Sequence, residues 1–283
     1  MSVRKINVGE IKQTVKALLL KANIELRSDV LQALEELYRK EEGGTQAKNM
    51  LGILVENANI AREKRIPICQ DTGLAVVFLN IGGNVVLDGG DIKAAVNEGV
   101  EEAYKEGSFR NSVVEDPITR KNTGTNAPAS IHIDIVEGDN IEISVMPKGF
   151  GSENKSRLIM MNPTADSEKI VDFCVETVKI AGPDACPPYV LGVGIGGTME
   201  SCALLAKKAL FRPINESNPK PHLAELEKKI KEKCNALGIG VMGLGGGSTV
   251  MGVGVEAGPT HIAGLPVAVN VGCHALRSAS TIL

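Results

Sequence analysis

Residues 189–211 read YVLGVGIGGTMESCALLAKKALF, an apolar run that passes through a glycine-rich turn into a helical pattern. Residues 189–193 have the length and apolar character of a buried strand, and residues 199–211 repeat apolar side chains at helical spacing. A strand followed at once by a helix is the unit from which mixed sheets with helical cover are built. This stretch therefore predicts an α/β or α+β fold.

The same two patterns recur along the rest of the chain. Helical spacing returns near residues 166–181 and 222–236, and short apolar segments at 250–255 and 267–271 are typical of buried strands. Eleven of the 31 glycines fall within residues 238–272, where they indicate tight turns and close backbone packing. The expected core is a mixed sheet with glycine-rich loops.

Two runs of alternating isoleucines predict a β-hairpin. Residues 131–135 and 141–145 place an apolar side chain at every second position, which is the period of a half-buried strand. Gly138, Asp139 and Asn140 between them are residues that tight turns prefer. We therefore expect these two strands to pair with each other.

The N-terminal part of the chain is expected to be helical. Apolar residues recur at helical spacing over residues 8–22, after residue 28 and over residues 45–64. No repeat, low-complexity linker or block of like charge divides the chain. We expect one domain over residues 1–283, with a helical layer over residues 1–65 packed on the mixed sheet.

Composition excludes several classes of protein. The formal net charge is −3, with three tyrosines, five phenylalanines and no tryptophan, which argues against a nucleic-acid binder with a basic surface or base-stacking platforms. No apolar run reaches the roughly 18 residues of a membrane span, and the first residues lack the apolar core of a signal peptide. We expect a cytoplasmic protein that binds neither nucleic acid nor membrane.

The six cysteines divide into two groups by their local sequence. Cys174, Cys202 and Cys234 lie in helical patterns and are expected in the core, since free cysteine packs as a small hydrophobe. The other three lie in turn-like segments beside Pro, Gly or Asp, and are Cys69, Cys186 and Cys273. Their long separations exclude the close pairs of zinc ribbons. Three converging loop thiolates could hold an iron–sulfur cubane with one open iron; three ordinary loop cysteines are the alternative.

A glycine motif supports a rival hypothesis. Residues 192–197 satisfy G-x-G-x-x-G between a strand and a helix, the arrangement of a dinucleotide site. Glu216 lies near the offset expected of the acid that binds the ribose, but Pro213 and residues 215–221 interrupt the strand that would carry it. A nicotinamide-dependent enzyme therefore stays open, as does a non-enzymatic module with a structural metal held by the cysteines.

Six short motifs, in this order, resemble those of the iron–sulfur hydro-lyases, which are the class I fumarases and L-tartrate dehydratases. They span nearly the whole chain, and together match the N-terminal domain of single-chain members or the separate α subunit of two-subunit members. The motifs are PICQDTG (67–73), KGFGSENK (148–155), ACPP (185–188), GIGGT (194–198), GPTHI (258–262) and GC (272–273). Where the family is expected to have a loop of three glycines, this chain has Gly149-Phe150-Gly151.

The resemblance implies an oxygen-sensitive 4Fe–4S cluster held by Cys69, Cys186 and Cys273. Its fourth iron would bind the hydroxyl and a carboxylate oxygen of a small dicarboxylate. Asp71 would be the acid or base, with His261 as a polar partner. The positions that line the substrate site in this family are matched by Gln70, Asp71, Arg110, Gly151 and His261.

The resemblance also implies an activity and an assembly. The expected reaction is the reversible hydration of fumarate to L-malate, with L-tartrate dehydration as the alternative. In the family, a second domain or a β subunit completes the site with further basic residues. We therefore expect an α subunit that forms a homodimer within an α2β2 assembly and is inactive or weakly active alone.

Overall fold

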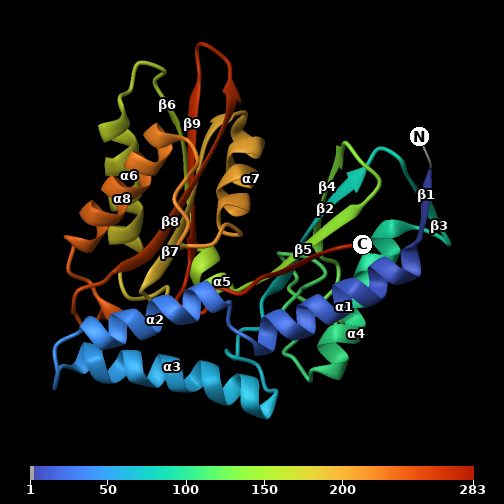
Figure 1. Ribbon diagram of the computed structural model, residues 1–283, viewed down its shortest axis with the longest axis horizontal. Coiled ribbons are helices and arrows are strands. Elements are labelled where there is room, and N and C mark those ends of the chain that lie inside the picture. Colours follow the sequence, from blue (N-terminus) through green and yellow to red (C-terminus); the bar gives the residue numbers. More distant parts are fainter. Residues whose placement is uncertain (1–2) are drawn as a thin grey trace. The chain divides into compact units, whose positions relative to one another are not determined.

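The computed structural model describes residues 3–283 and shows two compact units, which are treated separately (Figure 1). Unit 1 comprises the chain up to Arg27, Asn57–Phe150 and Arg277–Leu283, and unit 2 comprises Ser28–Glu56 and Gly151–Leu276. Compact units can be parts of one domain, so the single domain expected over residues 1–283 stays a prediction.

Unit 1 is built on a four-stranded sheet of order β10-β5-β2-β4. β2 (Leu74–Gly82) is parallel to β4 (Ser130–Val136) and antiparallel to β5 (Ile141–Lys148). β10 (Ala279–Ile282) pairs with the other edge of β5. The last strand of the chain thus completes a sheet whose other strands come from its first half.

The predicted hairpin is wrong, although both of its strands form. β2 lies between β4 and β5, because this apolar strand is buried along most of its length and is best covered by a neighbour on each edge. The turn around Gly138 crosses the end of β2 instead of closing a hairpin. There the Gly82 N–H donates to the Asn140 carbonyl (2.8 Å) and the Asn84 N–H to the Gly138 carbonyl (2.9 Å).

Two helices join this sheet in one hydrophobic core, α1 (Val8–Ile24) and α4 (Ile92–Glu106). Asp91 has a side chain typical of a helix N-cap, and its Oδ1 accepts from the Ala94 N–H at 2.7 Å at the start of α4. A short parallel pair, β1 (Arg4–Asn7) and β3 (Val85–Asp88), lies beside them.

Unit 2 has a sheet of order β6-β9-β7-β8 between two helical layers (Figure 1). α7 packs on one face of the sheet, while α6 and α8 share a core with the other face. These layers confirm the predicted α/β class. The elements are β6 (Arg157–Met161), α6 (Ser167–Ala181), β7 (Tyr189–Gly197), α7 (Met199–Ala209), α8 (Pro221–Asn235), β8 (Val250–Thr260) and β9 (Leu265–Gly272).

The three helices expected in the N-terminal part are confirmed as α1, α2 (Ser28–Lys40) and α3 (Gln46–Lys64). α1 belongs to unit 1 and α2 to unit 2, and the division between the units falls inside α3. Their arrangement as one layer over residues 1–65 stays a prediction. Within residues 3–283, none of the helices is long and apolar enough to cross a membrane.

The glycines that open the 192–197 motif allow a helix to pack closely on the sheet. A Cβ on Gly192 would lie 2.0 Å from the Ala206 carbonyl oxygen, and one on Gly194 would lie 2.1 Å from that of Cys202. Both carbonyls belong to α7, so the backbone of α7 rests directly on β7. This packing accounts for both glycines without a bound nucleotide.

Gly194→Ala is therefore expected to destabilise the protein by about 3 kcal/mol, because α7 must move away from β7 to admit the methyl group. Gly43→Ala is the matched control, since a Cβ at Gly43 meets no atom within 4 Å. The measurement is urea unfolding of the full chain. Equal midpoints for the two variants would contradict this account of the motif.

Candidate active site

The two groups of cysteines differ in burial as the sequence predicts. Cys69, Cys186 and Cys273 are partly exposed, whereas Cys174, Cys202 and Cys234 are fully buried. Burial raises the pKa of the Cys202 thiol to about 11 and that of Cys234 to about 12, and it also raises the pKa of Cys174. The three core thiols are therefore poor nucleophiles and poor metal ligands near neutral pH.

Alkylation of the metal-free native chain near neutral pH is expected to label Cys69, Cys186 and Cys273 and to spare the other three cysteines. The loop thiols are partly exposed, whereas burial both covers the three core thiols and raises their pKa, which disfavours their thiolate form. Peptide mass spectrometry reads the sites, and the unfolded chain, labelled at all six positions, is the control. Labelling of Cys174 at the rate of Cys69 would contradict the division.

The segment that carries Cys69 is fastened to the helices of unit 1. The Ile68 N–H donates to the Asn23 carbonyl at the end of α1 (2.9 Å), and the Asn57 side-chain amide of α3 donates to the Ile68 carbonyl (2.9 Å). Cys69 follows directly, with its thiol 3.5 Å from Gln70 Oε1. The cysteine thus lies on a loop of fixed course, with its sulfur accessible.

Asp71 is held at both of its carboxylate oxygens. Oδ1 accepts from the Gly73 N–H (3.0 Å) and Oδ2 accepts from the Phe150 N–H (2.9 Å), at the start of the 148–155 loop. A Cβ on Gly149 would lie only 3.2 Å from Oδ2, so a small residue there leaves room for the carboxylate. These donors fix the orientation of a partly exposed carboxylate, which retains lone pairs for a proton.

A buried arginine that the sequence analysis did not identify binds the backbone of Asp71. Arg277 is 3% exposed; its Nη2 donates to the Asp71 carbonyl (2.7 Å) and its Nη1 to Asn23 Oδ1 (3.2 Å). The available signal was that Arg277 is the single Lys or Arg in residues 234–283. A lone cation in an apolar stretch favours a buried structural role over a solvated one.

Two further groups fix the turn after Asp71. The Tyr104 hydroxyl donates to the Thr72 carbonyl (2.5 Å) and to the Gly73 carbonyl (3.0 Å), and burial raises the pKa of Tyr104 to about 12. Thr72 Oγ1 donates to the Arg110 carbonyl (2.8 Å), which ties the backbone of Arg110 to this turn. Unit 1 thus brings together Cys69, Gln70, Asp71 and the backbone of Arg110, whose side chain is exposed.

In unit 2, the Cys186 loop is joined to the Cys273 loop. Both the His274 N–H (3.2 Å) and the His274 ring Nδ1 (3.1 Å) form hydrogen bonds with the Cys186 carbonyl. Cys186 itself has a φ of +58°, a left-handed conformation that turns the chain sharply there. The two predicted ligands of unit 2 therefore lie on adjoining loops at one end of its sheet.

The 151–156 segment is bound to both cysteine loops. Its Lys155 forms an ion pair with Asp184 (2.9 Å), two residues before Cys186. Ser156 Oγ accepts from the Val271 N–H (3.1 Å), two residues before Cys273. Gly151, which opens the segment, is exposed, and a Cβ there meets no atom within 4 Å. The segment is therefore held against both cysteine loops, with the backbone of Gly151 exposed.

His261 lies elsewhere in unit 2. It follows β8 and precedes β9, whereas Cys273 follows the far end of β9, so the eight residues of β9 separate the two by roughly 25 Å. The ring is exposed, and its Nδ1 accepts from the Ala263 N–H at 3.1 Å. The structure does not bring His261 together with Cys186 and Cys273 in unit 2.

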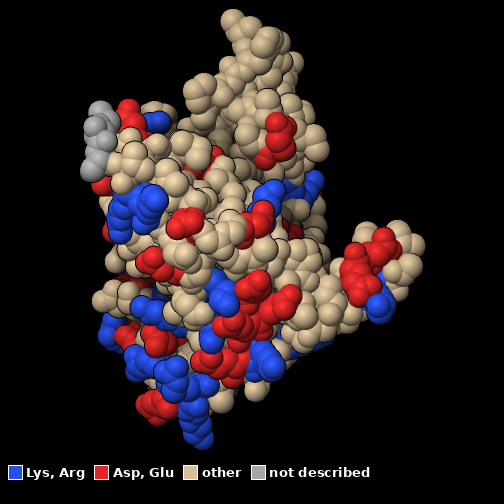
Figure 2. Space-filling model, turned by 90° about the vertical axis from the view of Figure 1, so that its right-hand side faces the viewer, with Lys and Arg blue, Asp and Glu red and all other residues tan. Residues whose placement is uncertain are grey.

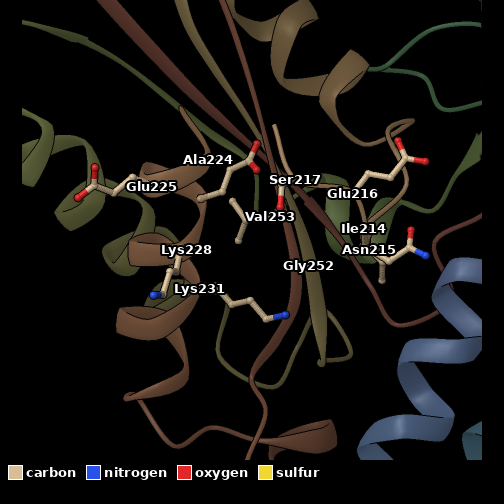
Figure 3. A pocket seen from close by; sticks show the side chains of 11 residues that line it. Ile214, Asn215, Glu216, Ser217, Ala224, Glu225, Lys228, Lys231, Gly252 and Val253 are labelled. Carbon is tan, nitrogen blue, oxygen red and sulfur yellow. The ribbon is translucent and has the colours of Figure 1, made fainter. Parts of the chain in front are cut away.

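The donor set suits an iron–sulfur cluster, because thiolate sulfur is its usual protein ligand and the three loop thiols are accessible. Cys69 belongs to unit 1 and the other two to unit 2, and within residues 3–283 no three His, Cys, Asp or Glu side chains gather closely enough to hold a metal ion. A cavity of about 650 Å³ between α8 and β8 is lined by none of the residues predicted to bind the cluster or the dicarboxylate (Figure 3).

Comparison with known proteins finds matches that cover most of the chain. The family model described as Fumarate hydratase (Fumerase) matches residues 12–282. A protein of Methanocaldococcus jannaschii, provisionally named L(+)-tartrate dehydratase subunit alpha, is 44% identical over 95% of this chain and 96% of its own length. L(+)-tartrate dehydratase subunit alpha of Escherichia coli K12 is 33% identical over 98% of this chain and 91% of its own length.

Proposed function

Because the chain belongs to the fumarate hydratase (Fumerase) family and is a carbon–oxygen hydro-lyase, we propose that it hydrates fumarate reversibly to L-malate as the α subunit of a two-subunit enzyme. One observation carries the proposal. Asp71 is oriented by two backbone donors two residues from an accessible cysteine, which is the arrangement of a proton carrier beside a metal ligand.

The proposed cofactor is a 4Fe–4S cluster held by Cys69, Cys186 and Cys273. When bound, it supplies a Lewis acid that makes the substrate's hydroxyl a better leaving group. Two of the three thiols already lie on loops joined through His274, which supports the proposal. The six free cysteines and an oxygen-sensitive cluster suit a reducing compartment, so we expect the enzyme in the cytoplasm.

The chain's own residues handle the proton and the carboxylates. Asp71 accepts the C3 proton of malate or returns it to fumarate, with its carboxylate held by the Gly73 and Phe150 N–H groups. Loss of that proton places negative charge on the adjacent carboxylate, which donors can stabilise. Arg110, with its planar guanidinium, and the backbone at Gly151 are the donors proposed for the carboxylates, and Gln70 contributes its amide.

We propose that a β subunit completes the site. The relatives named above are described as alpha subunits, and this chain matches at least 89% of the length of the first relatives compared. In residues 3–283, Arg110 is the one cation assigned to the substrate, whereas a dicarboxylate presents two charges. The proposed assembly is α2β2, and His261 acts in it only if another chain brings it to the cysteines.

The test is anaerobic reconstitution of the chain with iron and sulfide, with and without the β subunit encoded in the same organism. Fumarate hydration is expected only from the pair, because Arg110 is the one cation assigned to the dicarboxylate within residues 3–283. Full turnover by this chain alone would overturn the two-subunit proposal. The α chain alone should still acquire the brown cluster chromophore, which separates cluster assembly from catalysis.

L-tartrate is the second candidate substrate, and it is favoured by the names of the relatives. Tartrate differs from malate by one hydroxyl, and a pocket that hydrogen-bonds this group would reject malate by several orders of magnitude. A panel of malate and L-tartrate on the reconstituted pair decides between them. Faster turnover of L-tartrate would replace fumarate in this proposal and leave the roles of the cysteines intact.

A further inference from the structure

The two edge strands of the unit 2 sheet, β8 and β6, differ in whether side chains cover their outer backbone groups. Side chains from α8 and the preceding loop form hydrogen bonds with backbone groups of β8. Lys231 Nζ donates to the Met251 carbonyl (2.7 Å) and Asn218 Nδ2 to the Val255 carbonyl (2.8 Å), while Glu227 Oε1 accepts from the Val255 N–H (2.8 Å). Such capping stops another strand from adding to this edge.

The opposite edge strand, β6, is apolar and uncovered on its outer side within residues 3–283. Its sequence is RLIMM, and Ile159 and Met160, on opposite faces of the strand, are 40% and 55% exposed. No strand pairs with its outer side in the described chain, and residues 158–165 contain no charge. An apolar edge without lysine, proline or a covering helix is the kind of edge that pairs with another strand.

The register of β6 shows which of its backbone groups are available. The Val271 N–H points toward β6, because it donates to Ser156 Oγ. Backbone N–H and C=O groups alternate in direction along a strand, so those of Val269 also point toward β6 and form a hydrogen-bonded pair with Arg157. The N–H and C=O groups of Leu158 and Met160 therefore point away from β9. The outer edge of β6 therefore offers two donors and two acceptors.

These positions are self-complementary. If a second copy of β6 pairs antiparallel about a two-fold axis at Ile159, Leu158 of each copy faces Met160 of the other, and all four groups of each strand form hydrogen bonds. The two Ile159 residues then face each other in a non-hydrogen-bonded pair, where side chains lie closest. A two-fold axis at Ile159 thus gives each outward N–H and C=O group of β6 a hydrogen-bond partner.

Charges beside β6 fit the same two-fold axis. A cavity of about 390 Å³ is lined by Ile159, Met160 and Met161 and by Lys169 and Asp172 of α6. Lys169 and Asp172 are exposed, and neither forms an ion pair within residues 3–283. Across an isologous interface, Lys169 of each copy can pair with Asp172 of the other. A different partner would need a matching pair of charges of its own.

The same end of unit 2 is poor in charge. Residues 257–276 contain no Lys, Arg, Asp or Glu, and Figure 2 shows the topmost part of the molecule, which in Figure 1 carries the turn between β8 and β9, without blue or red side chains. Met161, at the end of β6, pairs with Leu265 beside this turn. Little charge would therefore need to be desolvated when β6 is covered.

We propose that β6 is the α–α contact of the assembly, pairing antiparallel with β6 of a second copy to join the two unit 2 sheets into one. The proposal rests on the two α chains of the proposed function and specifies their contact surface. Because the two copies of β6 are antiparallel, the strands of the second sheet run in the opposite direction to those of the first. The turn that carries His261 in one copy therefore lies at the end of the joined sheet where the other copy carries Cys186 and Cys273.

The first test measures the mass of the αβ complex and of the α chain by light scattering. Met160→Lys is expected to halve the mass of the wild-type assembly, because a lysine at the two-fold contact places two charges together. Ile118→Lys, at an 86% exposed site in unit 1, is the matched control and is expected to keep the wild-type mass. Release of the β subunit with the α–α contact intact would overturn the proposal, as would an unchanged mass.

A second test depends on register and does not disturb the fold. Ile159→Cys is expected to form a disulfide with the same residue of a second copy, since facing Cα atoms in such a pair lie about 4.5 Å apart. Ile118→Cys is the control for random collision. Peptide mapping after mild anaerobic oxidation identifies the linked residues. Absence of the 159–159 link, or a link to the β subunit, would overturn the register.

Charge exchange gives a third, independent readout. Lys169→Asp and Asp172→Lys are each expected to weaken α–α association at least tenfold, and the double exchange to restore it. Failure of the double variant to recover would contradict the contact. All three tests read association, so loss of fumarate hydration with intact dimers would count against the proposed function and leave this contact standing.

Discussion

Cys186→Ser is expected to leave the reconstituted enzyme without a stable 4Fe–4S cluster and to lower kcat/KM about a thousandfold or more, since an open iron supplies several kcal/mol to the transition state. Serine is close to cysteine in size, and the bonds of His274 go to the backbone carbonyl of Cys186. The loop should therefore keep its course while its thiolate ligand is lost.

Cys202→Ser is the matched control. The Cys202 thiol is buried in α7 and donates to the Gly194 carbonyl at 3.2 Å, a bond that a hydroxyl can also make. This variant should keep both the chromophore and the activity. Equal loss of the cluster in the two variants would mean that folding, and not ligation, is being measured.

Asp71→Asn is expected to lower kcat by about 10²-fold to 10⁴-fold, the range for loss of a general acid or base, with a smaller change in KM. The asparagine oxygen can still accept from the Gly73 N–H, so the turn is retained. The amide can neither take nor return a proton at the pH of the assay. Steady-state kinetics on the reconstituted pair give the two parameters separately.

Asp116→Asn serves as the control for a turn-forming aspartate. Asp116 Oδ1 accepts from the Ile118 N–H (2.8 Å) and the Thr119 N–H (2.7 Å), and these bonds lower the pKa of its carboxyl group. No site role is assigned to it, so its kinetics should match the wild type. If Asp71→Asn changes kcat no more than Asp116→Asn does, Asp71 is a turn residue and another group moves the proton.

Local patterns predicted the elements well where one apolar face decided them. The helices α6, α7 and α8 follow from periodicity, the strands β7, β8 and β9 from short apolar runs, and the cap at Asp91 from the residue type. The hairpin failed because strand pairing is not local. β2 precedes both of its neighbours in the chain, and its place between them depends on burying a strand that is apolar on both faces.

Prediction of the site residues was limited in the same way, because contacts between distant parts of the chain are not visible in local patterns. Motif spacing identified Cys69, Gln70 and Asp71 as one group, and neighbours in sequence remained neighbours in space. Arg277 escaped notice because its partners, Asn23 and the Asp71 carbonyl, are more than 200 residues away along the chain. His261 was grouped with the cysteines through its motif, although the length of β9 separates it from Cys273.

The most direct test of the central claim is Mössbauer spectroscopy of the α and β subunits reconstituted together with iron-57, before and after addition of malate. The account predicts the iron-57 spectrum of a 4Fe–4S cluster, in which one of the four iron sites changes when malate binds. The same spectrum with and without substrate, or a chain that takes up zinc in place of the cluster, would contradict it.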